Sequence, residues 1–191
     1  ELATAFSTGE VYAVDTTVQF PIAANFDEAT NVTLANAGWL LSGDATAVDN
    51  RLPLTRALNT LAGTAIFNRP FASTVGVNVQ FDYDMSGGTG ADGLAFFLVD
   101  GAQANPTSGA AGPSFGYAYG GTVLAGASQA YLGVGFDLWG NFTRTDAFHD
   151  GISNVENPNR VALRGPPTIV GSDGDNDEYG YVVGRATAYK L

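Results

Sequence analysis

Two short stretches of this sequence place carboxylate side chains where they could bind a ligand. In the first, GADGLAFFLVDG (residues 90–101), Asp92 stands between a run of small residues and the apolar block 94–99. An ionised carboxylate at the mouth of a buried strand raises the free energy of the fold unless a partner compensates its charge. Three interpretations follow from this pattern: a bound cation, a hydrogen-bonded ligand, or an ordinary turn.

The second stretch, GFDLWGNFTRTDAFHD, gathers oxygen-bearing side chains in one loop after a strand. It contains Asp137, Asn141, Asp146, His149 and Asp150. Calcium takes six to eight oxygen ligands from carboxylates, carbonyls and water, so this loop suits the ion chemically. Acidic loops are also often simply solvated, and the spacing alone leaves both interpretations open. We interpret His149, the sole histidine, as a surface or structural residue, because no Ser or Cys motif completes a nucleophilic triad.

A third acidic stretch, SDGDNDEYG, places Asp173, Asp175 and Asp177 at alternate positions before Glu178. This is how a calcium loop of the EF-hand type begins, but Gly184 stands where that loop needs its twelfth-position Glu. We therefore interpret the stretch as a solvated acidic hairpin tip.

The elements that must position these stretches are predicted to be β-strands. Apolar residues alternate with polar ones from residue 75 to 85, which predicts a strand with one buried face and one face in water. The turn SGGTGAD follows, and GLAFFLV predicts a return strand that is apolar on both faces and therefore central. Further strand candidates are VYAVDTTVQF, AGWLLSG, RLPLTRAL, GTAIFNRPF, AYLGVGFDLWG, NRVALRG and YGYVVGRATAYK.

Gly, Pro, Asn and Asp punctuate the gaps between these candidates, as many short strands in a sandwich or barrel require. No helix of ordinary length with capping signals stands out, and no repeat or linker divides the chain. We therefore predict a single all-β domain over residues 1–191. Residues 101–129 form a long loop of small residues, and such loops are usually functional or mobile.

The composition restricts the partners of such a domain. The 191 residues include 19 acidic and 8 basic side chains, a formal net charge of −11. This charge repels phosphate backbones and anionic lipid surfaces, so we expect no nucleic acid partner and favour cations and neutral ligands. No stretch approaches the roughly 20 apolar residues of a membrane span, so we expect no membrane insertion. Cysteine is absent, which excludes disulfides and thiolate metal sites and leaves the redox compartment open.

The pair ADGLAFFLVD and YLGVGFDLWGN, in this order and separated by the small-residue loop, resembles the legume (L-type) lectin family, above all its bacterial members. LPLTRALNTLAGTAIFNRPF and NRVALRG are similar to the same branch, and the similarity is strongest over residues 35–165. The resemblance implies an antiparallel β-sandwich of the concanavalin A-like jelly-roll type, with a shallow sugar site organised by calcium. The sequence ends at Leu191, before the closing strands that the family carries, so we expect those strands to be missing from it.

The resemblance also implies which residues bind the ion. Asp137, Asn141 and Asp146 match calcium ligands, and the backbone carbonyl of Trp139 matches a further one. The plant pattern has a second, transition-metal site that needs a Glu two residues before the first Asp, where this chain has Gly135. The histidine of that second site has no aligned match either. We therefore expect Ca²⁺ as the cofactor, without a transition metal beside it.

On the sugar side, Asp92 matches the acid that accepts hydrogen bonds from sugar hydroxyls, and the peptide bond between Ala91 and Asp92 would be cis. Asn141 also matches an amide donor to the sugar, and the Trp139 ring matches the aromatic platform on which the sugar lies. A neutral sugar offers paired hydroxyls and an apolar CH face, so a carboxylate, an amide and an aromatic ring are suitable partners.

One departure from the family affects this sugar site. Many members offer a glycine amide donor where the stretch GPSFG of this chain places Pro113, which has no N–H. The resemblance then leaves Ser114 or Gly116 as the substitute donor.

Three functions compete on these grounds. The leading prediction is a calcium-dependent carbohydrate-binding module of a secreted or surface-attached bacterial protein, one segment of an adhesin with neighbouring domains, whose partners are glycans or cell-surface saccharides. A glycosidase would need two carboxylates flanking a cleft. Glu is rare in this sequence, and no strand carries the motif Glu-x-Asp-x-x-Glu, so we expect no enzyme. The alternative is a lectin-like structural or protein-binding module whose sugar site has decayed, because fold alone does not establish function.

Overall fold

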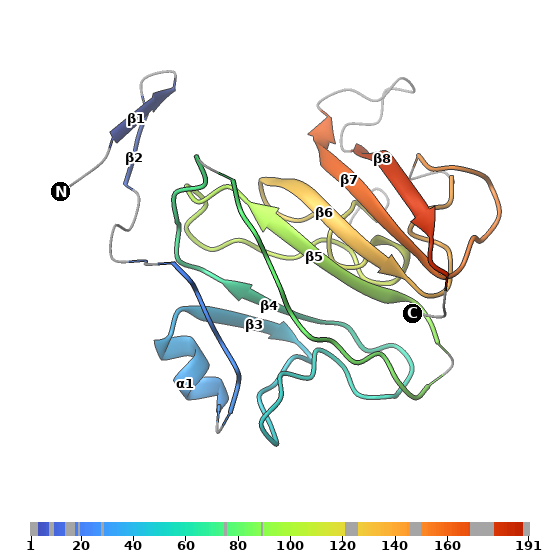
Figure 1. Cartoon of the computed structure of the whole chain (residues 1–191), viewed down its shortest axis with the longest axis horizontal. Helices are drawn as coiled ribbons and strands as arrows, with labels where there is room; N and C mark the ends of the chain where they lie inside the picture. The colour runs from blue at the N-terminus through green and yellow to red at the C-terminus, as the bar shows by residue number, and fades with distance from the viewer. Residues whose placement is uncertain are drawn as a thin grey trace.

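The computed structural model describes residues 4–7, 10–13, 18, 20–27, 29–74, 76–88, 90–120, 126–145, 150–168 and 178–188. Within them the regular structure is mostly antiparallel β, as the sequence predicts (Figure 1). β1 pairs with β2, β3 pairs with β4, and the remaining strands form one sheet in the order β5-β6-β7-β8. The elements are β1 (Thr4–Ser7), β2 (Glu10–Ala13), α1 (Asn31–Asn36), β3 (Trp39–Gly43), β4 (Gly63–Phe67), β5 (Gly93–Val99), the 3-10 helix η1 (Gly112–Ser114), β6 (Ala130–Asp137), β7 (Arg160–Thr168) and β8 (Glu178–Ala186).

The register of the four-stranded sheet sets which loops can meet. Gly93 at the start of β5 lies opposite Asp137 at the end of β6, and Asp137 in turn lies opposite Arg160 at the start of β7. The residues before β5, after β6 and before β7 therefore lie at the same end of the sheet.

The two faces of this sheet differ in side-chain size. One face presents large apolar residues, among them Phe96 and Phe136, whereas the other has Gly133 and Gly135 on β6. A Cβ at Gly133 would overlap the ring of Tyr117, and one at Gly135 would overlap the ring of Phe142. The two glycines therefore let aromatic rings of neighbouring loops lie directly on the strand. The buried core gathers around these rings, and its members are Tyr117, Ala118, Ala127, Ala130, Phe142, Ala162 and Tyr179.

A separate two-stranded sheet, formed by β3 and β4, precedes this sheet in the sequence. In β3 and β4, Trp39 lies opposite Phe67, and the rings of these two residues are 5.5 Å apart. The short helix α1 begins with a capping box in which Thr30 and Thr33 bond each other reciprocally. A six-residue helix spans less than two turns, which is too short for an apolar period to appear in the sequence.

No helix among the described residues has the length and apolar character that a membrane crossing needs.

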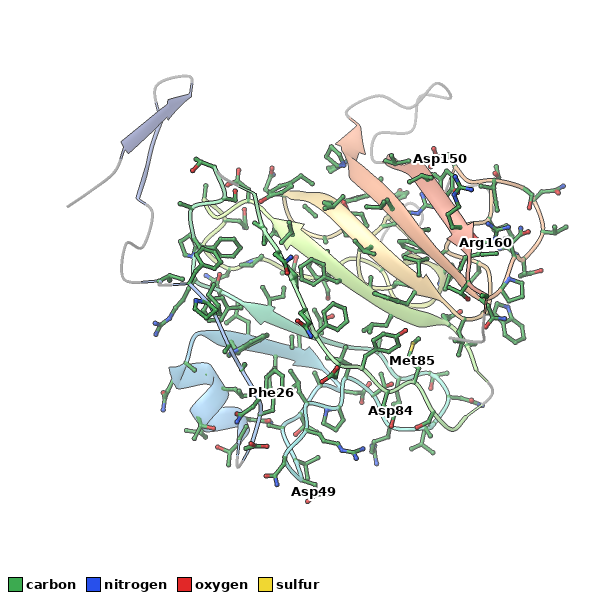
Figure 2. All side chains as sticks on the ribbon, in the orientation of Figure 1. Phe26, Asp49, Asp84, Met85, Asp150 and Arg160 are labelled. Atoms are coloured by element: carbon green, nitrogen blue, oxygen red, sulfur yellow. The ribbon has the colours of Figure 1, made fainter. Side chains whose placement is uncertain are left out.

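The strand predicted over residues 75–85 is wrong. Residues 76–85 belong to no strand, and their backbone N–H groups from residue 77 onward donate to no backbone carbonyl of the described residues. The rings of Phe81 and Tyr83 pack instead on Phe96 and Phe136 of the four-stranded sheet. The apolar residues at 77, 79, 81 and 83 remain 36–48% exposed, and Met85, labelled in Figure 2, is partly buried. Alternation predicts a pleated segment, but a strand also needs a neighbouring backbone, and no described strand lies beside it.

Most other strand predictions are confirmed. AGWLLSG, GTAIFNRPF, GLAFFLV and AYLGVGFDLWG contain β3, β4, β5 and β6, in that order. NRVALRG covers the first six residues of β7, and YGYVVGRATAYK covers all of β8 except its first residue. RLPLTRAL is not a strand, because only Arg51 forms an isolated bridge, with Val48. VYAVDTTVQF overlaps β2 at its start, and most of its remaining residues lie outside the described ones. The hairpin of β1 and β2 stands apart from the other sheets in Figure 1.

Candidate functional site

Asp92 and the β6–β7 loop (residues 138–159) meet at the end of the four-stranded sheet where β5 begins. The N–H of Trp139 donates to the backbone carbonyl of Asp92 at 3.2 Å. The side-chain amide of Asn141 donates to Asp92 Oδ1 at 2.5 Å, across a separation of 49 residues in the sequence. The antiparallel register of β5 and β6 therefore brings together the two stretches that the sequence analysis selected. The Ala91–Asp92 peptide bond is cis, as expected.

The Asp137 carboxylate organises the turn that follows β6. Its side chain is fully buried, Oδ1 accepts the N–H of Gly140 at 2.7 Å, and Oδ2 accepts the N–H and hydroxyl of Thr143 at 3.0 and 3.2 Å. Burial raises the pKa of Asp137, and these hydrogen bonds lower it only in part. No Lys or Arg of the described residues forms an ion pair with this carboxylate. A buried anion held only by dipoles attracts a cation.

The environment of Asn141 is the second feature that suits a bound cation. The residue is 7% exposed, and its Nδ2 is oriented by the bond to Asp92. Its Oδ1 is buried and accepts no hydrogen bond from the described part of the chain. A buried acceptor without a partner reduces the stability of the fold by about 1–3 kcal/mol. A ligand that contacts this oxygen would remove that cost. An amide oxygen is also a good ligand for calcium.

Trp139 lies between Asp137 and Asn141 in the sequence, and its ring is exposed to solvent. Its side chain is 47% exposed, although its backbone N–H is bonded to Asp92. Nothing among the described residues donates to its backbone carbonyl. The ring and the carbonyl of Trp139 could therefore both contact a ligand, through its aromatic face and its oxygen respectively.

A third loop, which contains η1, borders the site beside Asp92. A Cβ placed on Gly112 would lie 3.8 Å from Asp92 Oδ2, so the backbone of this loop runs past that carboxylate. The ring of Phe115 stacks on the ring of Phe142 with centroids 4.5 Å apart and an interplanar angle of 8°. This stack joins the third loop to the β6–β7 loop.

Of the two substitute amide donors proposed in this loop, the Gly116 N–H is engaged within it, whereas the structure shows Ser114 engaged through its hydroxyl. Ser114 is buried, and its hydroxyl donates to the carbonyl of Tyr119 at 2.7 Å. The N–H of Gly116 donates to the carbonyl of Ala110 at 2.7 Å. In this conformation the Gly116 N–H is therefore not available to a sugar, and the Ser114 hydroxyl already donates its hydrogen within the loop.

Several predicted site residues lie outside the described ones. They are Asp146, His149 and the acidic residues Asp173, Asp175 and Asp177, while Glu178 is the first residue of β8. Within the described ranges there is no group of three or more His, Cys, Asp or Glu residues that could hold a metal ion. Of the calcium ligands that the resemblance implies, the structure describes one carboxylate, one amide and one carbonyl: Asp137, Asn141 and Trp139.

No family model and no curated protein matches this chain. The interpretation of the site therefore depends on its own geometry and on the resemblance of its motifs.

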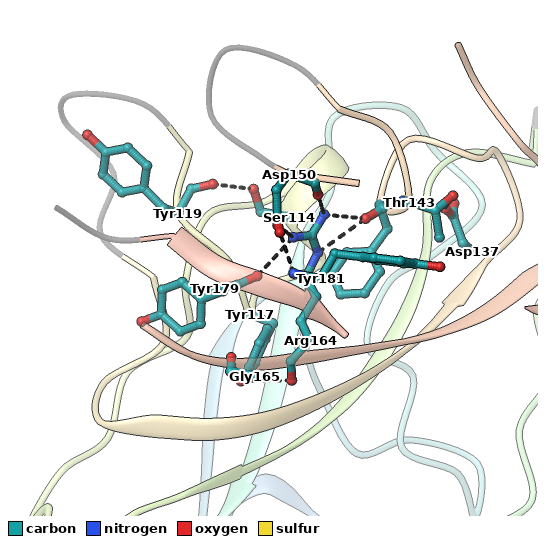
Figure 3. Close-up of polar contacts among 11 residues, drawn as sticks. Ser114, Tyr117, Tyr119, Asp137, Thr143, Asp150, Arg164, Gly165, Tyr179 and Tyr181 are labelled. Carbon is teal, nitrogen blue, oxygen red and sulfur yellow. Dashed lines mark hydrogen bonds and ion pairs between the residues drawn. The ribbon is translucent and has the colours of Figure 1, made fainter. Parts of the chain in front are cut away.

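The sequence analysis missed Arg164, although it lies close to the site. Its side chain is 1% exposed and lies on the same face of β7 as Ala162, within a network that Figure 3 shows. A signal was present in the sequence, because Arg164 directly follows the apolar run 161–163 of a predicted strand, and arginine is almost never fully buried without partners. The structure identifies those partners, which no local pattern could indicate.

Proposed function

We propose that this chain is a calcium-dependent carbohydrate-binding module, with the jelly-roll sandwich of an L-type lectin, from a secreted or surface-attached bacterial protein. The observation that carries the proposal is the two-sided environment of Asn141. Its amide nitrogen donates to Asp92, and its buried amide oxygen has no partner among the residues that the structure describes, in the turn that Asp137 organises. The residue thus links a position suited to a cation with a carboxylate suited to a sugar.

The residues present fit a calcium ion. Asp137, the carbonyl of Trp139 and Oδ1 of Asn141 would hold it, together with Asp146 from the same loop. Each is an oxygen ligand of the kind calcium prefers, and the orphaned Asn141 oxygen would gain the contact it lacks. Bound there, the ion would supply positive charge that neutralises the buried Asp137 and stiffens the turn.

Sugar recognition would use the outward side of the same loop. Asp92 is half-buried and can accept hydrogen bonds from hydroxyls, and the exposed Trp139 ring can lie against an apolar CH face. Asn141 would donate from its amide. Because the Gly116 amide is engaged and Pro113 has none, we expect the binding to depend on these three side chains.

A structural or protein-binding module is the second candidate. The engaged amide of Gly116 favours it, and so does the exposed apolar row of residues 77–83 outside any strand. Exposed apolar rows often mark protein contacts. This candidate retains the calcium-ordered turn but has no sugar.

Glycan-array binding, measured with calcium and with chelator, separates the two candidates. We expect binding by the wild type that is lost in chelator and lost in Asp92→Ala. The matched control is Asp100→Ala, which removes an exposed carboxylate at the other end of β5. Calcium binding by calorimetry without any glycan signal would favour the second candidate. Absence of both signals would contradict the calcium site itself.

A further inference from the structure

Arg164 is a buried cation in the middle of β7. All three guanidinium nitrogens donate to the protein (Figure 3). Nε and Nη2 bond the carbonyl of Phe142 at 3.2 and 2.6 Å, and Nη2 also bonds the carbonyl of Asp150 at 2.8 Å. Nη1 bonds Asp150 Oδ1 at 3.1 Å and the carbonyl of Tyr179 at 2.8 Å.

These bonds attach the β6–β7 loop to the sheet at two separate points. One point is Phe142, directly after Asn141, and the other is Asp150, which lies eight residues further along the chain. Asp150 Oδ1 also accepts the N–H of Tyr181 at 2.7 Å, so the second point reaches β8 as well. One side chain therefore holds both ends of the segment that contains the candidate ligand Asp146.

The first attachment acts directly on the candidate site. The guanidinium fixes the carbonyl of Phe142 and lies over its ring, with 5.0 Å between the Cζ atom and the ring centroid. The same ring stacks on Phe115 of the third loop and fills the space above Gly135. With the peptide after Asn141 fixed in this way, the orphaned Asn141 oxygen has a defined position.

The chemistry of the contact requires arginine. A planar guanidinium presents donors in a rigid fork, and here the fork spans three carbonyls and one carboxylate oxygen at once. A lysine ammonium is a compact charge with three donors and cannot reproduce that spacing. The contact is therefore one of geometry as well as charge.

We propose that Arg164 is a positioning residue that holds the β6–β7 loop at Phe142 and Asp150 and thereby sets the ion affinity of the turn that follows β6. The second half of this statement rests on the proposed function. Asp150 then serves as the partner of Arg164 and Tyr181 and is not itself an ion ligand. Residues that orient metal ligands typically change metal affinity by about 10–100-fold when they are replaced.

The test uses two readouts on the full chain. Amide hydrogen exchange around Phe142 and Asp150, in chelator, measures the loop without any ion. Calorimetry with calcium alone measures affinity. In Arg164→Lys we expect faster exchange in both places and a calcium affinity about 10–100-fold lower. The matched control is Arg185→Lys on β8, where the side chain is exposed, and it should behave like the wild type in both readouts.

The outcomes separate this inference from the proposed function. A folded Arg164→Lys variant with wild-type exchange and wild-type affinity would overturn the positioning role. If the wild type binds no calcium while exchange in Arg164→Lys still rises, the proposed function fails and the anchoring by Arg164 stands. If Arg164→Lys does not fold, Asp150→Asn decides by the same readouts: faster exchange and weaker calcium binding support the role, and unchanged values refute it.

Discussion

Replacing Asp137 with alanine should destabilise the protein even when no ion is present. The variant removes the acceptor for the N–H groups of Gly140 and Thr143, which are both buried residues. Each buried backbone donor without a partner costs about 1–3 kcal/mol, so the two together cost about 2–6 kcal/mol. Burial raises the pKa of Asp137, which means that removing the charge also relieves a desolvation penalty. We therefore expect a loss of about 2–3 kcal/mol in the free energy of unfolding, the lower part of that range.

Urea unfolding in chelator, followed by far-UV circular dichroism, measures this loss. A total stability of about 5–15 kcal/mol makes a change of this size easy to resolve. Thr143→Val keeps the backbone bond to Asp137 and removes only the hydroxyl bond of 3.2 Å, so it should cost about 0.5–1.5 kcal/mol. The control Asp100→Ala removes only a solvent-exposed bond from the Ala102 N–H and should cost no more than about 1 kcal/mol. If Asp137→Ala costs no more than this control, the carboxylate does not organise the turn.

Two further predictions concern the packing on β6. Burial raises the pKa of Tyr117, so its phenol stays neutral in the folded state. The same phenol ionises at about pH 10 in the unfolded state, and the free energy of unfolding should therefore fall as the pH rises above that value. Urea midpoints measured from pH 8 to 11 should fall less steeply for Tyr117→Phe than for the wild type or for the exposed control Tyr131→Phe, and parallel curves would contradict this. Gly135→Ala would push a methyl group into the ring of Phe142 and should cost about 1–3 kcal/mol, whereas Gly180→Ala on β8 meets open space. Equal melting temperatures for these two variants would show that the ring does not rest on β6.

The strands of the main sheet could be predicted because their signals are local. GLAFFLV and AYLGVGFDLWG combine strand-forming residues with glycines and turn residues at their ends, and both form strands where expected. The chemistry of the site was also visible locally, since Asp92 and Asp137 stand at the ends of those strands in the sequence itself. The short helix α1 escaped prediction because six residues are too few for an apolar period to appear.

The segment 76–85 is the reverse case. Its alternation is the clearest in the sequence, yet the segment lies over Phe96 and Phe136 without joining a sheet. Alternation describes the preference of side chains for two different faces, and it carries no information on whether a second backbone lies alongside. Strand pairing is a property of two segments, so one segment cannot determine it.

The sequence alone therefore determined the β class of the chain, the places of most strands, and the residue types that could bind an ion or a sugar. Only the tertiary structure decided that Asn141 meets Asp92, because the register of β5 and β6 depends on hydrogen bonds between residues far apart in the chain. It also decided that Arg164 points toward Phe142 and Asp150, since the face of a strand that meets a loop is chosen by packing. Local preferences act over a few residues, whereas a binding site of this kind forms only when distant segments satisfy one another's buried polar groups.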